Sequence, residues 1–282
     1  MNFFEAIILG IIQGLTEFLP ISSTAHLTFA GKLMNLISDS NPEKWTAFIA
    51  VIQIGTLLSV LIYFWKDLIL IIKKFLEENW FNRVKFSNQS TDSKVGWYII
   101  ISTIPVVVIG LAFKDFIEGI FTKNLYVISS SLILLAIILA VAEKVSKFSK
   151  TINDLNWFDA IIIGFAQALA LIPGSSRSGT TITAGLFLGL NRETAARFSF
   201  LMSIPAVAAS GLLQFYQSLK YLDQHGLIVM IISTVVSGFI GYLSIGFLLK
   251  YLRTKSMWIF VAYRILIGVT ILIFIFTGII KP

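Results

Sequence analysis

The sequence predicts an all-α polytopic membrane protein, and three observations support this prediction. Of the 282 residues, 56% are hydrophobic and only 13% are charged, whereas soluble domains contain roughly 25% charged residues. Several apolar runs reach the ~20 residues that a helix needs to cross ~30 Å of hydrocarbon. These runs do not alternate polar and apolar residues as the strands of a membrane β-barrel do. The composition therefore excludes an ordinary soluble enzyme, and also a disordered chain, which needs low hydrophobicity and high charge.

The chain contains one pattern twice. Residues 2–17 read NFFEAIILGIIQGLTE and residues 156–171 read NWFDAIIIGFAQALAL, with eight identities in sixteen positions and no gap. The identical pairs include Gln13 with Gln167, which chance similarity between apolar helices rarely produces. Self-similarity of this kind indicates two copies of one structural unit.

Each copy is predicted to open with a re-entrant helical hairpin, at residues 3–34 and 157–190. In both, an apolar helix stops at a proline that is followed by polar residues. After a shift of one residue in the alignment, Pro20–Ser23 matches Pro173–Ser176. Proline cannot donate a backbone hydrogen bond and disfavours a helix before it. Broken backbone at membrane depth needs protein or a watery cavity around it, so we expect the two breaks to lie together.

Three full membrane spans follow each hairpin. In chain order, the apolar runs that predict them are 46–65, 95–113, 125–142, 198–216, 227–249 and 258–278. The first repeat, residues 1–150, and the second, residues 151–282, then have opposite orientations within one membrane domain. This inverted-topology repeat has six transmembrane helices plus two re-entrant hairpins, whose tips meet near mid-membrane.

The distribution of Lys and Arg predicts the orientation. If the N-terminus lies outside, the inside loops hold fourteen Lys and Arg residues and the outside loops hold six. Cytoplasmic loops of membrane proteins are enriched in Lys and Arg. Membrane topology therefore explains the net charge of +7, and we expect no nucleic-acid partner. Both termini are therefore predicted outside. The absence of cysteine excludes disulfides and thiolate chemistry.

Two polar clusters lie at the predicted hairpin tips, where polarity is costly. Ionisable residues inside a membrane usually mark functional sites. The first cluster offers a carboxylate and an imidazole and consists of Gln13, Glu17, Ser22, Ser23, Thr24 and His26. The second offers a guanidinium and hydroxyls and consists of Gln167, Ser175, Ser176, Arg177, Ser178, Thr180 and Thr181. If the tips meet, Glu17 and Arg177 neutralise each other.

The tips together suit a phosphate ligand. Helices that start near Ser22 and Ser175 would present free N–H groups and partial positive charge to an anion. Gly174 and Gly179 would let the backbone approach it closely. Arg177 adds a fork of donors that matches phosphate oxygens. Two opposed helix starts and an arginine suit a diphosphate better than a single carboxylate.

The first cluster also holds residues suited to catalysis. His26 shares a helical face with Ser22 and Ser23, so it could act as the general base for a serine hydroxyl. Gln13 and Glu17 lie four residues apart and offer the hard oxygen ligands that Mg²⁺ or Ca²⁺ prefers.

The same residues are also compatible with purely structural roles and with transport. His26 and Gln13 could simply hydrogen-bond to neighbouring helices, and Arg264 could extend from the last span to the cytosolic interface. A polyprenyl-phosphate flippase or another transporter would also need an anion site between two broken helices. Transport needs neither a nucleophile nor a base, so Ser23 together with His26 favours an enzyme.

Both motifs resemble those of the bacterial undecaprenyl-diphosphatase family, the bacitracin-resistance type of integral membrane phosphatase. Gln13–Glu17 matches the (E/Q)xxxE motif of that family, Phe18–His26 continues it as FLPISSTAH, and Pro173–Thr181 matches PGxSRSxxT. The similarity extends over the whole chain. The resemblance implies hydrolysis of undecaprenyl diphosphate to undecaprenyl phosphate and inorganic phosphate, which recycles the lipid carrier of the cell wall and confers resistance to bacitracin.

The resemblance further implies a divalent cation, Mg²⁺ or Ca²⁺, and an active site on the outer face of the bacterial plasma membrane. On the matching positions, Glu17, Ser23, His26 and Arg177 would be catalytic, and Gln13 with Glu17 would bind the metal. The residues expected to hold the diphosphate are Ser22, Thr24, Gly174, Ser176, Ser178 and Thr181. Two mechanisms stay open, a phosphorylated Ser23 and a water activated by His26. The oligomeric state is also open, and a homo-oligomer is compatible with the sequence.

Overall fold

The structure, a computed structural model, describes residues 1–37, 42–113, 117, 123–218 and 223–282. Within these residues the secondary structure is helical apart from one isolated β-bridge. The helices are α1 (Phe3–Phe18), α2 (Ser23–Leu33), α3 (Pro42–Tyr63), α4 (Trp65–Leu76), α5 (Thr91–Ala112), α7 (Leu125–Val145), α8 (Trp157–Leu169), α9 (Arg177–Phe187), α10 (Arg192–Ser218), α11 (Gln224–Leu252) and α12 (Trp258–Phe276). Short helical turns at Glu77–Phe81, Phe86–Asn88 and Ile152–Asp154 complete the described elements.

The predicted membrane spans are present. Six of the described helices are long and apolar enough to cross a membrane, namely α3, α5, α7, α10, α11 and α12. Their ends lie within a few residues of the predicted runs, and the largest difference is the start of α10, at Arg192 instead of residue 198. The all-α polytopic fold is therefore confirmed for the described part of the chain.

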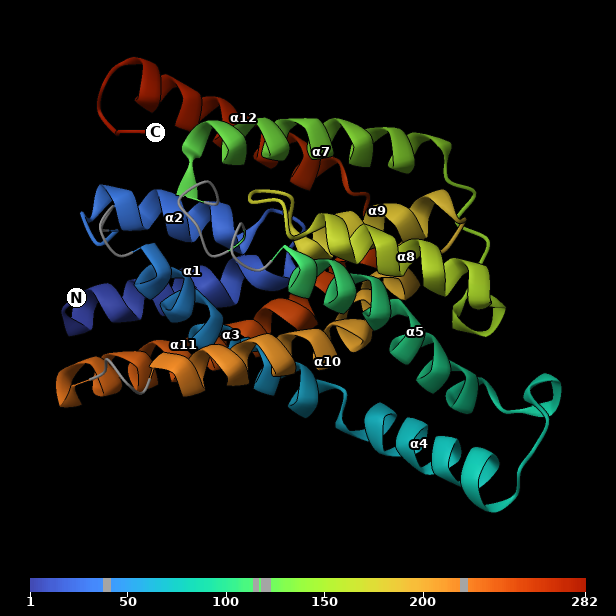
Figure 1. Ribbon diagram of the computed structural model, residues 1–282. Coiled ribbons are helices and arrows are strands. Elements are labelled where there is room, and N and C mark those ends of the chain that lie inside the picture. Colours follow the sequence, from blue (N-terminus) through green and yellow to red (C-terminus); the bar gives the residue numbers. More distant parts are fainter. Residues whose placement is uncertain (38–41, 114–116, 118–122, 219–222) are drawn as a thin grey trace.

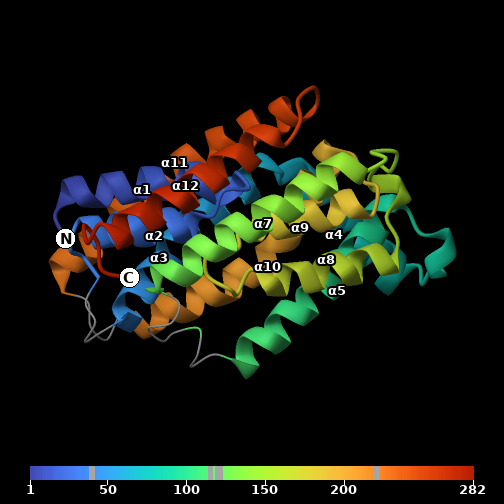
Figure 2. The same ribbon diagram turned by 90° about the horizontal axis from the view of Figure 1, so that it is seen from above.

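The two hairpins are formed by α1 with α2 and by α8 with α9. The chain breaks between them at Leu19–Ser22 and at Ala170–Ser176, which include the two predicted prolines. Both termini lie at one end of the bundle, together with the first hairpin, whereas α4 and the second hairpin lie toward the other end (Figures 1 and 2). The tips of the hairpins meet between these ends.

Matching caps set the same local structure in both hairpins. Asn2 and Asn156 each accept a backbone hydrogen bond within a capping box, which starts α1 and α8. Ser22 and Ser176 cap α2 and α9 from unusual backbone conformations, with φ values of 75° and 68°. The equivalent caps of the two hairpins are 154 residues apart in both cases, from Asn2 to Asn156 and from Ser22 to Ser176.

This constant spacing corrects one part of the sequence alignment. The shift of one residue that pairs Pro20 with Pro173 is wrong, because the caps and not the prolines keep the register of the hairpins. The second outgoing helix accordingly starts at Arg177, after the Ser176 cap and two residues after Ser175. Ser23 and Arg177 thus occupy the same position, the first residue of an outgoing helix.

Each hairpin packs against a span from the other half of the chain. Helix α1 lies against α11, and α8 lies against α5. Glycines allow these close approaches: a Cβ atom on Gly14 would lie 2.8 Å from the carbonyl oxygen of Ser237, and one on Gly164 would lie 2.8 Å from the Cα of Ser102. Because each hairpin packs against a span of the other half, these contacts connect the two halves and fix where the hairpin tips meet.

Candidate active site

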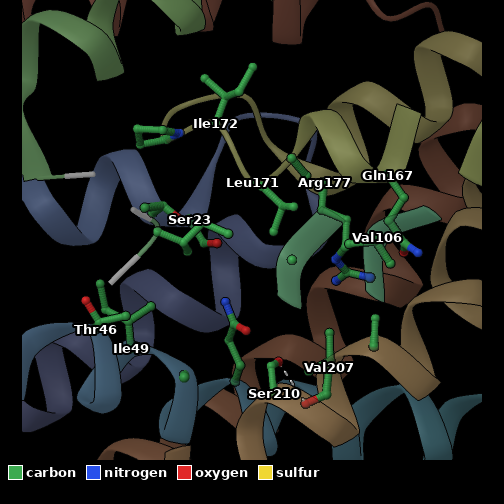
Figure 3. A pocket seen from close by; sticks show the side chains of 18 of the residues that line it. Ser23, Thr46, Ile49, Val106, Gln167, Leu171, Ile172, Arg177, Val207 and Ser210 are labelled. Carbon is green, nitrogen blue, oxygen red and sulfur yellow. Dashed lines mark hydrogen bonds between the residues drawn. The ribbon is translucent and has the colours of Figure 1, made fainter. Parts of the chain in front are cut away.

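A cavity of about 420 Å³ lies where the hairpin tips meet (Figure 3). At the tips its lining is polar and includes Glu17, Ser22, Ser23, Thr24, Ser176 and Arg177. Its apolar walls come from α3, α5 and α10 and include Ile49, Val106, Val107, Leu111, Val207 and Leu213. The walls of α5 and α10 follow prolines within those helices, Pro105 and Pro205. The cavity therefore combines a polar end with a mainly apolar passage.

Glu17 is the centre of the polar end. Its Oε1 accepts a hydrogen bond from Nη2 of Arg177 at 2.7 Å, and the carboxylate is only 5% exposed. Its Oε2 accepts from the hydroxyl of Ser23 at 2.8 Å and from Nε2 of Gln13 at 2.9 Å. A buried carboxylate needs such partners, because desolvation otherwise opposes its charge. The structure thus joins residues from α1, α2 and α9 into one network, with Glu17 and Arg177 directly paired.

His26 does not join this network. Its Nδ1 lies 2.7 Å from the carbonyl oxygen of Ser22, and its Nε2 lies 2.9 Å from the hydroxyl of Tyr263. The rings of His26 and Tyr263 also stack, with centroids 5.6 Å apart. A spacing of three or four residues places side chains on one helical face, but it does not decide which neighbour each contacts. The hydrogen-bond partner of Ser23 is therefore Glu17 and not His26.

Two of the predicted phosphate-binding hydroxyls cap helices at the cavity. Ser22 accepts a hydrogen bond from the backbone N–H of Ala25, and Ser176 accepts one from that of Gly179. Thr24 also lines the cavity, from the first turn of α2. These positions place the N-termini of α2 and α9 toward the cavity, where their partial positive charge favours an anion.

Two other predicted phosphate-binding residues hold α9 against the first hairpin and against α10. The hydroxyl of Ser178 donates to the carbonyl oxygens of Glu17 and Leu19, across the junction of the hairpins. The hydroxyl of Thr181 lies 2.6 Å from that of Ser199, on α10. Neither side chain belongs to the cavity lining. Their contacts fix the position of α9.

The two glycines of the second motif make room for protein atoms. Gly174 lines the cavity with a φ of 86°, and a Cβ atom there would collide with the carbonyl oxygen of Ile128. A Cβ atom on Gly179 would lie 2.5 Å from Nη1 of Arg264. Contacts with α7 and with Arg264 therefore explain why these positions need glycine.

Arg264 joins the two tips from within the bundle. It is 0% exposed, so it does not extend to the cytosolic interface. Its guanidinium donates to the carbonyl oxygens of Pro20 at 3.2 Å, Ser175 at 3.0 Å and Leu132 at 3.3 Å. Two of these carbonyls belong to the breaks of the two hairpins. The sequence marks Arg264 as an ionisable residue inside a span, but the hydrogen-bond partners of Arg264 depend on the tertiary fold.

The donor set at the tips fits a hard cation in part. The described part of the chain has no group of three or more His, Cys, Asp or Glu side chains that could hold a metal. Glu17 offers a carboxylate, and Oε1 of Gln13 is buried without a hydrogen-bond partner. Oxygen donors suit Mg²⁺ or Ca²⁺. Because Glu17 is shared with Arg177, such an ion would need phosphate oxygens to complete its coordination.

Comparisons with known proteins show the family of this chain. The family model described as "Bacitracin resistance protein BacA" matches residues 6–270. An undecaprenyl-diphosphatase of Syntrophobacter fumaroxidans is 56% identical over 276 residues, 98% of each chain. An undecaprenyl-diphosphatase of Chloroherpeton thalassium is 51% identical over 99% of this chain and 98% of its own. One of Chlorobaculum tepidum is 49% identical over 100% of both. Since these matches cover both hairpins and all six spans, the chain belongs to the bacitracin resistance protein BacA family.

Proposed function

We propose that the protein hydrolyses undecaprenyl diphosphate to undecaprenyl phosphate and inorganic phosphate. The observation that carries this proposal is the hydrogen-bonded set of Ser23, Glu17 and Arg177 at the polar end of a cavity with apolar walls. The full-length relatives named undecaprenyl-diphosphatase support the substrate. A serine paired with a carboxylate favours a hydrolase over a flippase, because transport needs no nucleophile.

In this proposal Ser23 is the nucleophile and Glu17 is its general base. The Ser23 oxygen bonds to the terminal phosphorus, its proton moves to Oε2 of Glu17, and the bond from that phosphorus to the bridging oxygen breaks. Undecaprenyl phosphate leaves with the bridging oxygen. Water then attacks the phosphoserine, Ser23 regains a hydrogen, inorganic phosphate leaves, and one proton passes to solvent. His26 supports α2 through Ser22 and Tyr263 and takes no proton.

Positive charge at the tips would stabilise the transferring phosphoryl group. Arg177 lies beside Glu17, and the N-termini of α2 and α9 face the cavity. The buried charge of Arg264 lies behind both hairpin breaks. Fixed donors of this kind stabilise developing charge without reorganising during the reaction, which is the main source of catalysis in phosphoryl transfer.

The direct test measures phosphate release from undecaprenyl diphosphate by the purified protein in detergent. We expect the wild type to release phosphate. The rate of Ser23→Ala should be at least ~100-fold lower, because nucleophiles and general bases usually contribute on this scale. Rapid acid quenching should trap phosphoserine at position 23 in the wild type. Thr270→Ala, which removes an exposed hydroxyl on α12, is the control. A Ser23→Ala protein with the wild-type rate would contradict the proposed role.

A divalent cation, Mg²⁺ or Ca²⁺, belongs to the same proposal. Gln13 and Glu17 would hold it, and it would offset the negative charge of the diphosphate. We expect a chelator to reduce phosphate release and added Mg²⁺ or Ca²⁺ to restore it. An unchanged rate after exhaustive chelation and dialysis would remove the cation from the proposal and leave Ser23 and Glu17 in place.

We also propose that the protein lies in the bacterial plasma membrane with its cavity open to the outer face. The lining extends from the tips along α3 and α10 to Thr46 near the start of α3 and Gln214 near the end of α10, toward the end where both termini lie. The opposite end carries α4, with Lys66, Lys73 and Lys74. An excess of basic residues marks the cytoplasmic end of a membrane protein.

A further inference from the structure

Gln167 is a polar side chain on the cavity wall that the reaction described above does not use. It lies on α8, lines the cavity and is 0% exposed. Its Nε2 donates a hydrogen bond of 3.4 Å to the carbonyl oxygen of Ser102, and its Oε1 has no partner. Burying an unsatisfied amide oxygen costs about 1–3 kcal/mol. A ligand in the cavity is the natural partner for such an atom.

The chemistry of its neighbour fixes which atom of the amide is free. The carbonyl of Ser102 can only accept, so the atom of Gln167 that faces it must be the NH₂ group. The free atom is therefore the oxygen, which can only accept. Ionised phosphate oxygens are acceptors as well, so the partner of Gln167 is a hydrogen-bond donor or a cation and not an ionised phosphate oxygen.

A second unpartnered atom narrows the choice of ligand. Nη1 of Arg177 is also buried without a hydrogen-bond partner, although Nη2 binds Glu17. Beside Gln167 the second hairpin offers no carboxylate to offset the repulsion between a metal cation and the Arg177 guanidinium, so a neutral ligand is favoured. A water molecule can donate to Oε1 of Gln167 and accept from Nη1 of Arg177. Gln167 and Arg177 both line the cavity, and in the view of Figure 3 they lie on one side of it and Ser23 on the other.

The first hairpin shows why this amide is different from its counterpart. Gln13 occupies the equivalent place on α1, and four residues later Glu17 accepts its amide hydrogen. Four residues after Gln167 the chain has Leu171, so the second hairpin offers no carboxylate there. Oε1 of Gln13 is unpartnered as well, but Gln13 does not line the cavity, whereas Gln167 does. The first hairpin thus presents a carboxylate to the cavity, and the second presents an amide oxygen.

We propose that Gln167 is a positioning residue that holds the attacking water, an inference that rests on the proposed hydrolase function. The water lies opposite Ser23 and attacks the phosphorus in line with the Ser23 oxygen. A bond forms from the water oxygen to phosphorus, and the bond from phosphorus to Ser23 breaks. Glu17 returns to the Ser23 oxygen the proton that it took in the first step, one hydrogen of the water stays on the phosphate, and the other passes to solvent. Gln167 accepts a hydrogen bond and takes no proton.

The test compares water with an added alcohol as acceptor of the phosphoryl group. Methanol at molar concentration would compete with water, and its oxygen would end in methyl phosphate. We expect Gln167→Ala to lower phosphate release about tenfold, the effect of losing roughly 1.4 kcal/mol of transition-state stabilisation. The same variant should raise the ratio of methyl phosphate to phosphate several-fold, because the bound water is no longer favoured and space is available. Trapped phosphoserine should increase.

Two further variants separate positioning from structural damage. Gln167→Met keeps the volume of the side chain without its oxygen, so it should lower phosphate release as Gln167→Ala does. Thr103→Val, which changes α5 next to the Ser102 carbonyl, should leave the product ratio unchanged. Equal loss of both products in Gln167→Ala and Gln167→Met, or an unchanged rate and ratio, would overturn the proposal. A wild type that releases no phosphate would instead refute the proposed function.

Discussion

At the scale of single residues, the site depends on Glu17. One carboxylate accepts hydrogen bonds from three side chains, Gln13, Ser23 and Arg177. These partners belong to three helices, so Glu17 both joins the hairpins and lies within reach of the Ser23 proton. Removing one member of a buried ion pair leaves the other charge uncompensated. The same residue therefore affects stability and the proposed chemistry.

Glu17→Gln separates charge from shape at this position. We expect phosphate release to fall at least ~100-fold, because an amide cannot accept the proton of Ser23. The thermal unfolding temperature in detergent should fall as well, since Arg177 loses its anionic partner. Glu193→Gln is a matched control, because it removes only the exposed ion pair with Arg253. A Glu17→Gln protein with the wild-type kcat would exclude Glu17 as the base.

Arg264→Lys tests the contact that holds the two hairpin breaks together. An ammonium cannot replace the planar guanidinium that reaches three carbonyl oxygens from different segments. Each buried acceptor left without a partner costs about 1–3 kcal/mol. We therefore expect a lower unfolding temperature and slower phosphate release. Arg253→Lys, at an exposed site, should change neither. Equal stability of Arg264→Lys and wild type would contradict this role.

At the scale of elements, close helix contacts through small residues position the hairpins. Membrane helices associate without a hydrophobic driving force from water, so they depend on close packing. Gly55 of α3 is such a contact: a Cβ atom there would overlap the carbonyl oxygen of Thr234 and the hydroxyl of Ser237 on α11. Gly246 of α11 faces Tyr63 with ordinary spacing, since a Cβ atom would lie 3.5 Å from the ring.

These two glycines give a matched pair of substitutions. Gly55→Ala should lower the unfolding temperature clearly, because backbone atoms of α11 would have to move. Gly246→Ala should be neutral or slightly stabilising, since alanine favours a helix by about 1 kcal/mol over glycine and the space is available. Thermal unfolding of the three proteins in one detergent gives the comparison. Equal effects of both changes would show that the α3–α11 contact is not tightly packed.

At the scale of the whole molecule, the arrangement has two distinct ends. Both termini lie at the same end, where Lys32 of the first hairpin donates to the carbonyl oxygen of Pro282 at 2.6 Å. The other end carries α4 and the turns up to α5. The sequence analysis places Lys114 and Lys220 in loops on the outer side of the membrane, and the structure does not describe these two residues. The charge distribution predicts that the terminal end faces out.

The chain has no cysteine, so single cysteines can report this orientation. Ser87→Cys lies on an exposed turn at the α4 end, and Lys281→Cys lies on an exposed position at the terminal end. In intact cells, a membrane-impermeant maleimide should label position 281 and leave position 87 unlabelled until the membrane is opened. The reverse pattern would overturn the predicted orientation. It would leave the geometry of the cavity unchanged.

The sequence by itself determined the helical class, the six spans, the two hairpin breaks and most of the polar residues at the tips. Hydrophobic run length, helix breakers and caps act over short distances along the chain, so the sequence records them directly. Even there, the proline-based alignment was wrong by one residue, because the caps at Ser22 and Ser176 set the register.

Only the tertiary structure decided which side chains meet. Ser23 and His26 are close in sequence, yet Ser23 contacts Glu17 whereas His26 contacts Tyr263. Arg264 binds carbonyls of residues 20 and 175, far away in the chain. Partners of buried polar groups depend on how helices pack, and that packing combines contacts from the whole chain that no local pattern contains.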